Sequence, residues 1–301
     1  MGELLSTYAE ARLPAAGAGK AAVPGNGPPL EMVPIPPQFM GRVAEQAELG
    51  DLLCQPGITV LLGQPGIGKT ALAAKTLPQV FSIAQIIWQT IDAQSSIAKI
   101  VEALGIDPAV MTENQWVDVV VEQLRSQKFV LVLDQAEELL DAGKSALEVS
   151  LYRPAHRVYG QLLKQLAGHA LQSSVLILTQ QPFRDLERYQ RKGLPVYSLQ
   201  LTGLGAEDVR ALVRSYDLGD KGYKRLASLY QGHPGCLMAA LPQVVDLYNG
   251  DIEEFLKATM FVEADTKVAY EVSFDRLSAI EQSVLNTLAS GTLTFLEIVK
   301  N

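Results

Sequence analysis

The sequence predicts an α/β fold in which a parallel sheet is covered by helices on both faces. Short, near-continuous apolar runs have the length and composition of buried strands, and stretches with helical apolar spacing separate them. A glycine-rich segment follows the first run and leads into a helix, as in a strand–loop–helix unit. After Gly203 the apolar spacing is helical only, so an all-helical domain is expected to follow the sheet. The predicted strands are residues 58–62, 86–91, 129–133, 175–178 and 195–201.

The composition is that of a globular protein without a membrane segment. The 301 residues suffice for about two domains, with 48% apolar and 19% charged residues. A formal net charge of −8 disfavours direct binding to nucleic acid, because the surface would repel its phosphates. No apolar stretch approaches the roughly 18 residues that span a bilayer, and the chain does not begin with a signal peptide. We therefore expect a cytoplasmic protein in which Cys54 and Cys236 are buried, reduced thiols.

The first 38 residues have the composition of a flexible linker. They contain seven of the sixteen prolines, many Ala and Gly residues, and little apolar periodicity. Such a segment cannot bury enough apolar surface to offset the entropy lost on ordering. The folded part is therefore expected to begin at Phe39.

Apolar side chains at helical spacing predict the helices between the strands and those that follow them. Thr112 and Gln115 form a capping box at the start of one helix, and Gly105 ends the helix before it. The predicted helical stripes lie at residues 49–53, 97–104, 116–124 and 159–166 around the sheet, and at 209–216, 237–248 and 284–288 beyond it.

The C-terminal residues contain two further capping boxes, Ser278 with Glu281 and Thr294 with Glu297. The chain stops at Asn301, about two turns into the last predicted helix. The sequence is therefore expected to end inside a domain.

Residues 63–70 read Gly-Gln-Pro-Gly-Ile-Gly-Lys-Thr and match the pattern G-x-x-x-x-G-K-[ST] at every fixed position. Glycines let the backbone curl so that successive N–H groups point at phosphate oxygens, and the following helix aims its unsatisfied donors at the same anion. The segment is therefore predicted to be a P-loop that binds the polyphosphate of ATP or ADP. The residues expected to line it are Gly63, Gly66, Ile67, Gly68, Lys69, Thr70 and Ala71.

Acidic and cationic side chains complete the predicted chemistry at the phosphates. Lys69 supplies a positive charge for the β and γ phosphates, and the Thr70 hydroxyl completes the shell of a Mg²⁺ ion that keeps several waters. Asp134 ends an apolar strand and would hold the same Mg²⁺ through water. Glu137 or Glu138 could orient the attacking water as a general base, although the dipole also stabilises acids in the first turn of a helix. The candidate catalytic residues are thus Lys69, Asp134 and Glu137.

Several further segments resemble motifs of STAND NTPases, the class that includes NB-ARC proteins. The resemblance rests on Phe39-Met40-Gly41-Arg42 with Glu45 (hhGRExE), residues 81–90 with Trp88 (second strand) and Gly232-His233-Pro234 (G-x-P). Residues 152–162, 199–204 and 249–256 look like a bacterial NB-ARC group often fused to WD or TPR repeats, and residues 277–289 look like the first winged-helix helix. The implied domains are a linker at 1–38, a P-loop nucleotide-binding domain at 39–202, a helical domain at 203–270 and an incomplete winged-helix domain at 271–301.

The resemblance implies that the nucleotide lies between the sheet domain and the helical domain. Carried over by motif, Arg42 and its neighbours would flank the adenine, and Pro234 would pack against it. The plainer alternatives are a solvated surface arginine and a turn between two helices. His233 is expected to be a turn residue, and His156 and His169 are expected at the surface.

Two departures from the family pattern bear on hydrolysis. The fourth strand is expected between the P-loop strand and the Asp134 strand, so that its tip faces the γ-phosphate. Family members usually carry Thr-Ser-Arg or Thr-Thr-Arg at this tip, whereas residues 179–181 here are Thr-Gln-Gln. A neutral amide cannot offset developing phosphoryl charge, and Arg184 could do so only if the loop bends back. Gln135 is the second departure, because many relatives carry an acid there.

The leading hypothesis is a nucleotide-gated switch with slow turnover. ADP would hold the two domains together, and exchange for ATP would release them toward self-association; this requires different affinities for the two arrangements. The first alternative is a sensor that holds ADP or ATP without hydrolysis, which Gln181 and Gln135 favour. The second is a P-loop kinase or GTPase, but the guanine motif N-K-x-D is absent.

Overall fold

The computed structural model describes residues 31–36, 39–141, 152–257, 274, 277 and 279–289. Within this part of the chain, five parallel strands form one sheet in the order β2-β3-β4-β1-β5. Each strand matches its predicted run to within one residue at either end, which confirms the predicted α/β class. The strands are β1 (Gly57–Leu62), β2 (Ile86–Thr90), β3 (Val130–Asp134), β4 (Ser174–Thr179) and β5 (Val196–Gln200).

The strand order brings three segments that were predicted to be functional to one edge of the sheet. β4 lies between β1 and β3, as predicted, with Leu62 beside Thr179 and Leu133 beside Ile177. Because the strands are parallel, their carboxyl ends meet at the same edge. The glycine-rich loop after β1, Asp134 at the end of β3 and the Thr-Gln-Gln tip after β4 therefore lie together.

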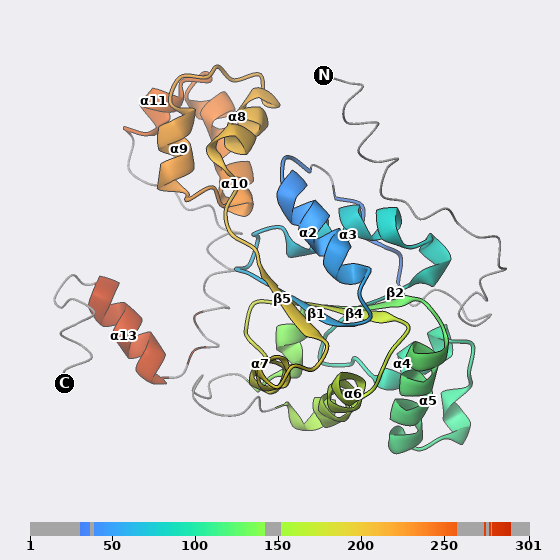
Figure 1. Cartoon of the computed structure of the whole chain (residues 1–301). Helices are drawn as coiled ribbons and strands as arrows, with labels where there is room; N and C mark the ends of the chain where they lie inside the picture. The colour runs from blue at the N-terminus through green and yellow to red at the C-terminus, as the bar shows by residue number, and fades with distance from the viewer. Residues whose placement is uncertain are drawn as a thin grey trace.

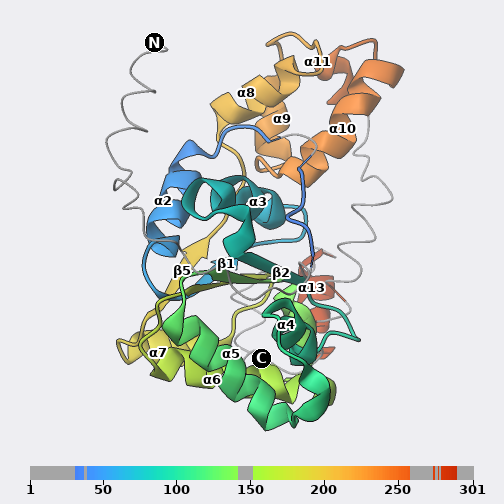
Figure 2. The same cartoon turned by 90° about the vertical axis from the view of Figure 1, so that its right-hand side faces the viewer.

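Helices cover both faces of the sheet, as Figures 1 and 2 show. One face carries α2 (Val43–Leu53) and α3 (Lys69–Val80). The opposite face carries α4 (Ile97–Ala103), α5 (Glu113–Ser126), α6 (Arg157–Gly168) and α7 (Arg184–Arg191). The capping box predicted at Thr112 and Gln115 is present at the start of α5. Short 3₁₀ helices are η1 (Ile83–Gln85), η2 (Pro108–Val110), η3 (Ala136–Leu139) and η4 (Pro154–His156).

Two apolar cores lie on the two faces because successive strand side chains point in opposite directions. In β2, Ile87 joins the core beneath α4 to α7, whereas Trp88 joins the core beneath α2 and α3. All five residues of β3 are buried, as expected for a strand in the middle of a sheet covered on both faces. This packing explains why the strands are nearly continuous apolar runs.

The helices after β5 form a separate cluster with its own apolar core. They are α8 (Ala206–Arg214), α9 (Tyr223–Leu229), α10 (Pro234–Leu247) and α11 (Ile252–Phe255). Further along, α13 (Ala279–Ala289) is the helix predicted near residue 284. Ser278, Thr294 and Glu297, which were predicted as capping residues, lie outside the described residues.

Two features differ from the sequence-based expectations. Residues 31–36 lie in the segment predicted as a linker, yet the Glu31 carboxylate accepts bonds from the Thr90 N–H at 2.9 Å and the Thr90 hydroxyl at 2.7 Å. Cys54 was expected to be buried but is exposed, in the turn that follows α2. Cys236 is partly exposed, and no disulfide joins the two thiols. Across the described residues, no helix is long and apolar enough to cross a membrane.

We expect Gly232→Ala to lower the free energy of unfolding by roughly 1–3 kcal/mol. Gly232 has a φ of 67°, and a Cβ there would collide with the Leu204 carbonyl oxygen, which belongs to the backbone leading into α8. Urea denaturation measures the change. Gly219→Ala is the matched control, because a Cβ at Gly219 meets no atom within 4 Å; equal losses in both variants would contradict the prediction.

Candidate functional site

The glycine-rich loop joins the end of β1 to the start of α3. Gly66 and Gly68 have φ values of 72° and 100°, which L side chains rarely adopt. Gly68 is the N-cap residue of α3, and no side chain accepts a hydrogen bond at that cap. The first-turn N–H groups of α3 are therefore available to an anion held in the loop.

The Lys69 side chain lies inside this loop. Only 9% of its surface is exposed, and its Nζ donates to the Gly63 carbonyl oxygen at 2.8 Å and the Gln64 carbonyl oxygen at 3.0 Å. Burial lowers the pKa of Lys69, while the negative charges of Glu137 and Asp134 act in the opposite direction. The loop thus holds a cation beside its own backbone donors.

Thr70 and Asp134 face each other across the loop. The Thr70 hydroxyl lies 3.0 Å and 3.2 Å from the two Asp134 carboxylate oxygens, and the Gln135 N–H donates to Asp134 Oδ1 at 2.9 Å. Burial raises the pKa of Asp134, although both hydrogen bonds oppose the shift.

Two oxygen-bearing side chains this close fit a Mg²⁺ ion, which usually takes one or two protein ligands and completes its shell with phosphate and water. In the part of the chain that the structure describes, no cluster of three or more His, Cys, Asp and Glu side chains could hold a metal by itself. A Mg²⁺ ion at Thr70 and Asp134 would take its further ligands from phosphate and water.

The two acids of η3 point to different partners. Glu137 is 3% exposed, and its Oε2 accepts a bond from the Gln180 N–H at 3.1 Å, at the tip of β4. Glu138 instead forms an ion pair with Arg153 at 2.9 Å. Glu137 is therefore the acid that faces the edge where the loop and the β4 tip meet.

The tip of β4 is attached to the glycine-rich loop. The Gly63 N–H donates to the Thr179 carbonyl oxygen at 3.1 Å, and the Gln181 N–H donates to the Thr179 hydroxyl at 3.1 Å. Arg184 begins α7, where its guanidinium pairs with Glu187 at 3.0 Å. The glutamine rather than an arginine thus occupies the tip.

His156 is buried, so the surface position expected for it is wrong. It is 1% exposed, its Nδ1 lies 3.3 Å from the Glu138 carbonyl oxygen, and its ring packs edge-on against Tyr159 at 5.9 Å between centroids. The residue lies just before the apolar stripe of α6, so periodicity gave no sign of its burial. His169 is exposed, as expected.

Arg42 is also buried, and the alternative of a solvated surface arginine is wrong. It is 3% exposed, with Nη2 donating to the Ile67 carbonyl oxygen at 2.9 Å and to the Thr202 carbonyl oxygen at 2.7 Å. Nη1 pairs with Glu45 at 3.0 Å. Arg42 therefore connects the segment before α2 both to the glycine-rich loop and to the residues that follow β5.

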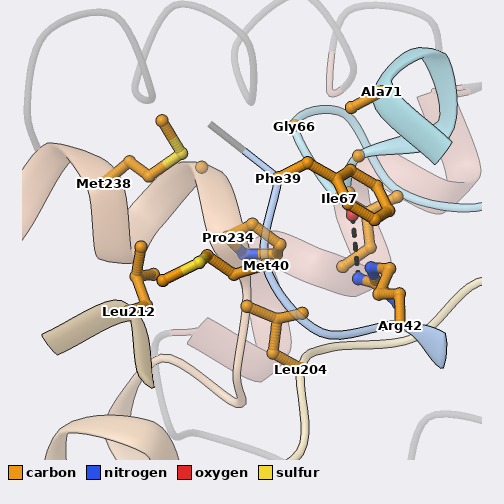
Figure 3. Close-up of a pocket in the computed structure, with 12 residues that line it drawn as sticks. Phe39, Met40, Arg42, Gly66, Ile67, Ala71, Leu204, Leu212, Pro234 and Met238 are labelled. Atoms are coloured by element: carbon orange, nitrogen blue, oxygen red, sulfur yellow. Dashed lines mark hydrogen bonds between the residues drawn. The ribbon is translucent and has the colours of Figure 1, made fainter. Parts of the chain in front are cut away.

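An apolar pocket of about 130 Å³ opens beside the loop, between the sheet and the helical cluster. Figure 3 shows Phe39 and Met40 from the segment before α2, and Pro234 from the first turn of α10, around this space. The pocket brings together most of the residues predicted to bind the nucleotide. The lining residues are Phe39, Met40, Arg42, Gly66, Ile67, Gly68, Ala71, Leu204, Leu212, Pro234, Gly235 and Met238.

His233 has a larger role than the turn residue that was expected. It is the N-cap of α10, with its Nδ1 accepting from the Cys236 N–H at 3.3 Å, and its Nε2 lies 2.8 Å from the Pro65 carbonyl oxygen. The proline that follows it, in the first turn of α10, is a recognisable sign of a helix start. The second partner of His233 is 168 residues away in sequence, so no local pattern could have identified the contact.

No protein-family model matches this sequence. An uncharacterised WD repeat-containing protein of Nostoc sp. is 26% identical over 275 residues, which are 83% of this chain and 22% of that protein. A crystal structure of a STAND protein with a tetratricopeptide repeat sensor from Pyrococcus horikoshii matches 87% of this chain and 36% of its own, with 18% identity and a TM-score of 0.51. Cdc6p from Pyrobaculum aerophilum matches 62% of this chain and 51% of its own, with 17% identity and a TM-score of 0.41.

The match to the Pyrococcus protein, together with the parallel sheet, shows that this chain shares the α/β fold of the matched part of that STAND protein. The chain spans about a fifth of the Nostoc protein and about a third of the Pyrococcus protein.

Replacing Arg42 with Met should lower the free energy of unfolding by roughly 2–4 kcal/mol, because buried carbonyl acceptors would lose a charged donor. The Met side chain retains most of the apolar stem, so the loss reports on the guanidinium. Chemical denaturation provides the measurement. Arg125→Met is the control, since the ion pair of Arg125 with Glu122 is exposed and should contribute less than about 0.5 kcal/mol. A similarly small loss of stability in Arg42→Met would show that the hydrogen bonds of the buried guanidinium do not stabilise the fold.

Proposed function

We propose, from this fold and the glycine-rich loop within it, that the chain is an ATP- and ADP-binding regulatory module of STAND type. The proposal rests on one observation, which is that the glycine-rich loop and the apolar pocket form one continuous surface. Gly66, Ile67 and Gly68 belong to the phosphate-binding loop and also line the apolar pocket. One ligand with an anionic tail and an apolar base could therefore fill both at once.

The pocket supports a purine base as the apolar part of the ligand. Apart from Arg42 and backbone glycines, its walls are apolar side chains such as Phe39, Met40 and Pro234. A flat aromatic base gains from apolar contact on its faces, and few polar groups are needed to fix its orientation. Adenine is favoured over guanine because the chain lacks an N-K-x-D motif.

The loop supports the polyphosphate. Lys69 would neutralise the β and γ phosphates, and the N–H groups at the start of α3 would bind their oxygens. Thr70 and Asp134 would hold Mg²⁺, which neutralises charge on the phosphate oxygens when bound. Burial of Lys69 strengthens its attraction for phosphate, since charges interact more strongly away from water.

The position of the pocket supports a conformational switch. Leu204, Leu212, Pro234 and Met238 come from the linker to the helical domain or from that domain itself, whereas the loop belongs to the sheet domain. A nucleotide that contacts both would stabilise their closed arrangement. Linkage requires that closure also raise the affinity for the nucleotide. We infer that ADP favours closure and that exchange for ATP leads to opening and self-association in the cytoplasm.

Slow hydrolysis follows from the tip of β4. Gln181 lies where an arginine would stabilise developing charge, and the Gln181 side chain carries none. In this proposal Asp134 holds Mg²⁺, and Glu137 orients the attacking water. Turnover should therefore be well below the roughly 10 per second of an average enzyme.

A second function, a sensor that binds nucleotide without hydrolysing it, is favoured by one contact. The carboxylate of Glu137 already accepts a hydrogen bond from the Gln180 N–H. The bond holds one oxygen of this carboxylate against the β4 tip, which leaves fewer acceptor positions for an attacking water.

Lys69→Ala should weaken ADP binding by about 10- to 100-fold, since it removes charge-assisted hydrogen bonds to phosphate. Isothermal titration calorimetry with MgADP measures the dissociation constant. Lys75→Ala is the matched control, because Lys75 lies in the same helix and is exposed. If Lys69→Ala bound ADP as tightly as Lys75→Ala, the phosphate site would lie elsewhere.

Single-turnover hydrolysis of ATP distinguishes the two functions. For a slow ATPase, Glu137→Gln should lower the rate at least 10-fold, whereas Gln181→Arg should raise it at least 10-fold by restoring charge at the β4 tip. A non-hydrolysing sensor would show no phosphate release from the wild type above that of Lys69→Ala. Wild-type turnover near 10 per second would instead argue against both.

A further inference from the structure

Three consecutive carbonyl groups of the glycine-rich loop accept hydrogen bonds from outside the loop. The Pro65 carbonyl lies 2.8 Å from His233 Nε2, and the Gly66 carbonyl accepts from the Gly235 N–H at 3.1 Å. The Ile67 carbonyl accepts from Arg42 Nη2 at 2.9 Å. Two of these three donors belong to the first turn of α10, in the helical cluster.

Holding these carbonyls also orients the N–H groups of the loop. The peptide group is planar and trans, so its C=O and N–H point in opposite directions. A carbonyl held toward α10 or Arg42 therefore directs the N–H of the following residue toward the inside of the loop. The Ile67 N–H follows this rule, because it lies 3.3 Å from the Gln64 carbonyl oxygen within the loop.

The contact between the loop and α10 is close enough to restrict both backbones. A Cβ built on Gly235 would lie 3.1 Å from the Gly66 carbonyl oxygen and 3.3 Å from His233 Cε1. A Cβ on Gly66 would lie 3.1 Å from the same imidazole carbon. Two glycines and one imidazole ring thus form a tight contact that a small rotation of the loop peptides would disturb.

We propose that His233 is a positioning residue for the phosphate site: docked α10 holds the loop in the conformation that binds phosphate. This inference rests on the proposed nucleotide binding and adds the route by which the helical domain controls it. Docking places His233 Nε2 and the Gly235 N–H against the loop carbonyls, so the loop does not have to be ordered by the ligand. The binding site therefore gains affinity by preorganisation when the domains are closed.

The hydrogen bonds of His233 define its protonation state. Nδ1 accepts from the Cys236 N–H, so the hydrogen of the neutral ring lies on Nε2 and is donated to the Pro65 carbonyl. Burial and the nearby cations Arg42 and Lys69 lower the pKa of His233, which favours this neutral ring, although the bond to Pro65 acts in the opposite direction.

The test separates the contact to Pro65 from the capping of α10. Asn is a good N-cap residue, but its side chain is too short to reach from α10 to the Pro65 carbonyl. We expect His233→Asn to bind MgADP about 10-fold more weakly than the wild type, with little change in thermal stability of the nucleotide-free protein. His169→Asn is the matched control, because His169 is exposed and distant in sequence from the loop.

A second measurement does not depend on nucleotide. In ¹⁵N NMR spectra of the nucleotide-free protein, His233 should be neutral with its hydrogen on Nε2, and His233→Asn should shift the Gly66 amide resonance. Failure of the wild type to bind MgADP would refute the proposed function, whereas the NMR result would still test the contact. Equal ADP affinities in His233→Asn and His169→Asn, or a hydrogen on Nδ1 of His233, would overturn the positioning role.

Discussion

The turn from β1 into α3 is the constraint on which the rest of the site depends. Gly66 and Gly68 adopt left-handed conformations there, so the backbone curls within a few residues. A curled chain of this kind has two faces, because N–H groups gather on its inner side and carbonyl groups on its outer side. The inner face lies at the N-terminus of α3 and suits an anion. Arg42 and α10 donate hydrogen bonds to the outer face, so one turn generates both the candidate anion site and the contact with the helical cluster.

The strand order explains why the candidate functional residues lie close to this turn. β4 is inserted between β1 and β3, and the Gly63 N–H bonds to the Thr179 carbonyl at its end. On its other side, the same tip contacts η3, because the Gln180 N–H donates a hydrogen bond to the Glu137 carboxylate. The β4 tip is therefore connected to the glycine-rich loop on one side and to the candidate base on the other. A charge change at residue 181 would act where these two connections meet.

The parts of this site that could be predicted are those encoded by neighbouring residues. The strands, the glycine-rich loop and Asp134 follow from short apolar runs and one contiguous motif, because burial in a covered parallel sheet imposes that pattern locally. The parts that could not be predicted depend on tertiary contacts. The Arg42 guanidinium reaches the Thr202 carbonyl 160 residues away, and His233 reaches Pro65 at 168 residues. His156 is similar, because its burial comes from packing against η3 and Tyr159 rather than from its place in a stripe.

In the proposed nucleotide switch, the energy would come from the few contacts that join the sheet and the helical cluster. Moving an equilibrium from 1:99 to 99:1 needs about 5.5 kcal/mol of differential binding, and a typical hydrogen bond contributes about 0.5–1.5 kcal/mol. The His233 and Gly235 bonds to the loop can therefore supply at most about 3 kcal/mol. Apolar contact of the base with Pro234, Leu212 and Met238 has to supply the remainder, which corresponds to about 100 Å² of buried apolar surface. The proposed switch therefore needs the apolar lining of the pocket as much as the hydrogen bonds to the loop, since neither contribution would be sufficient by itself.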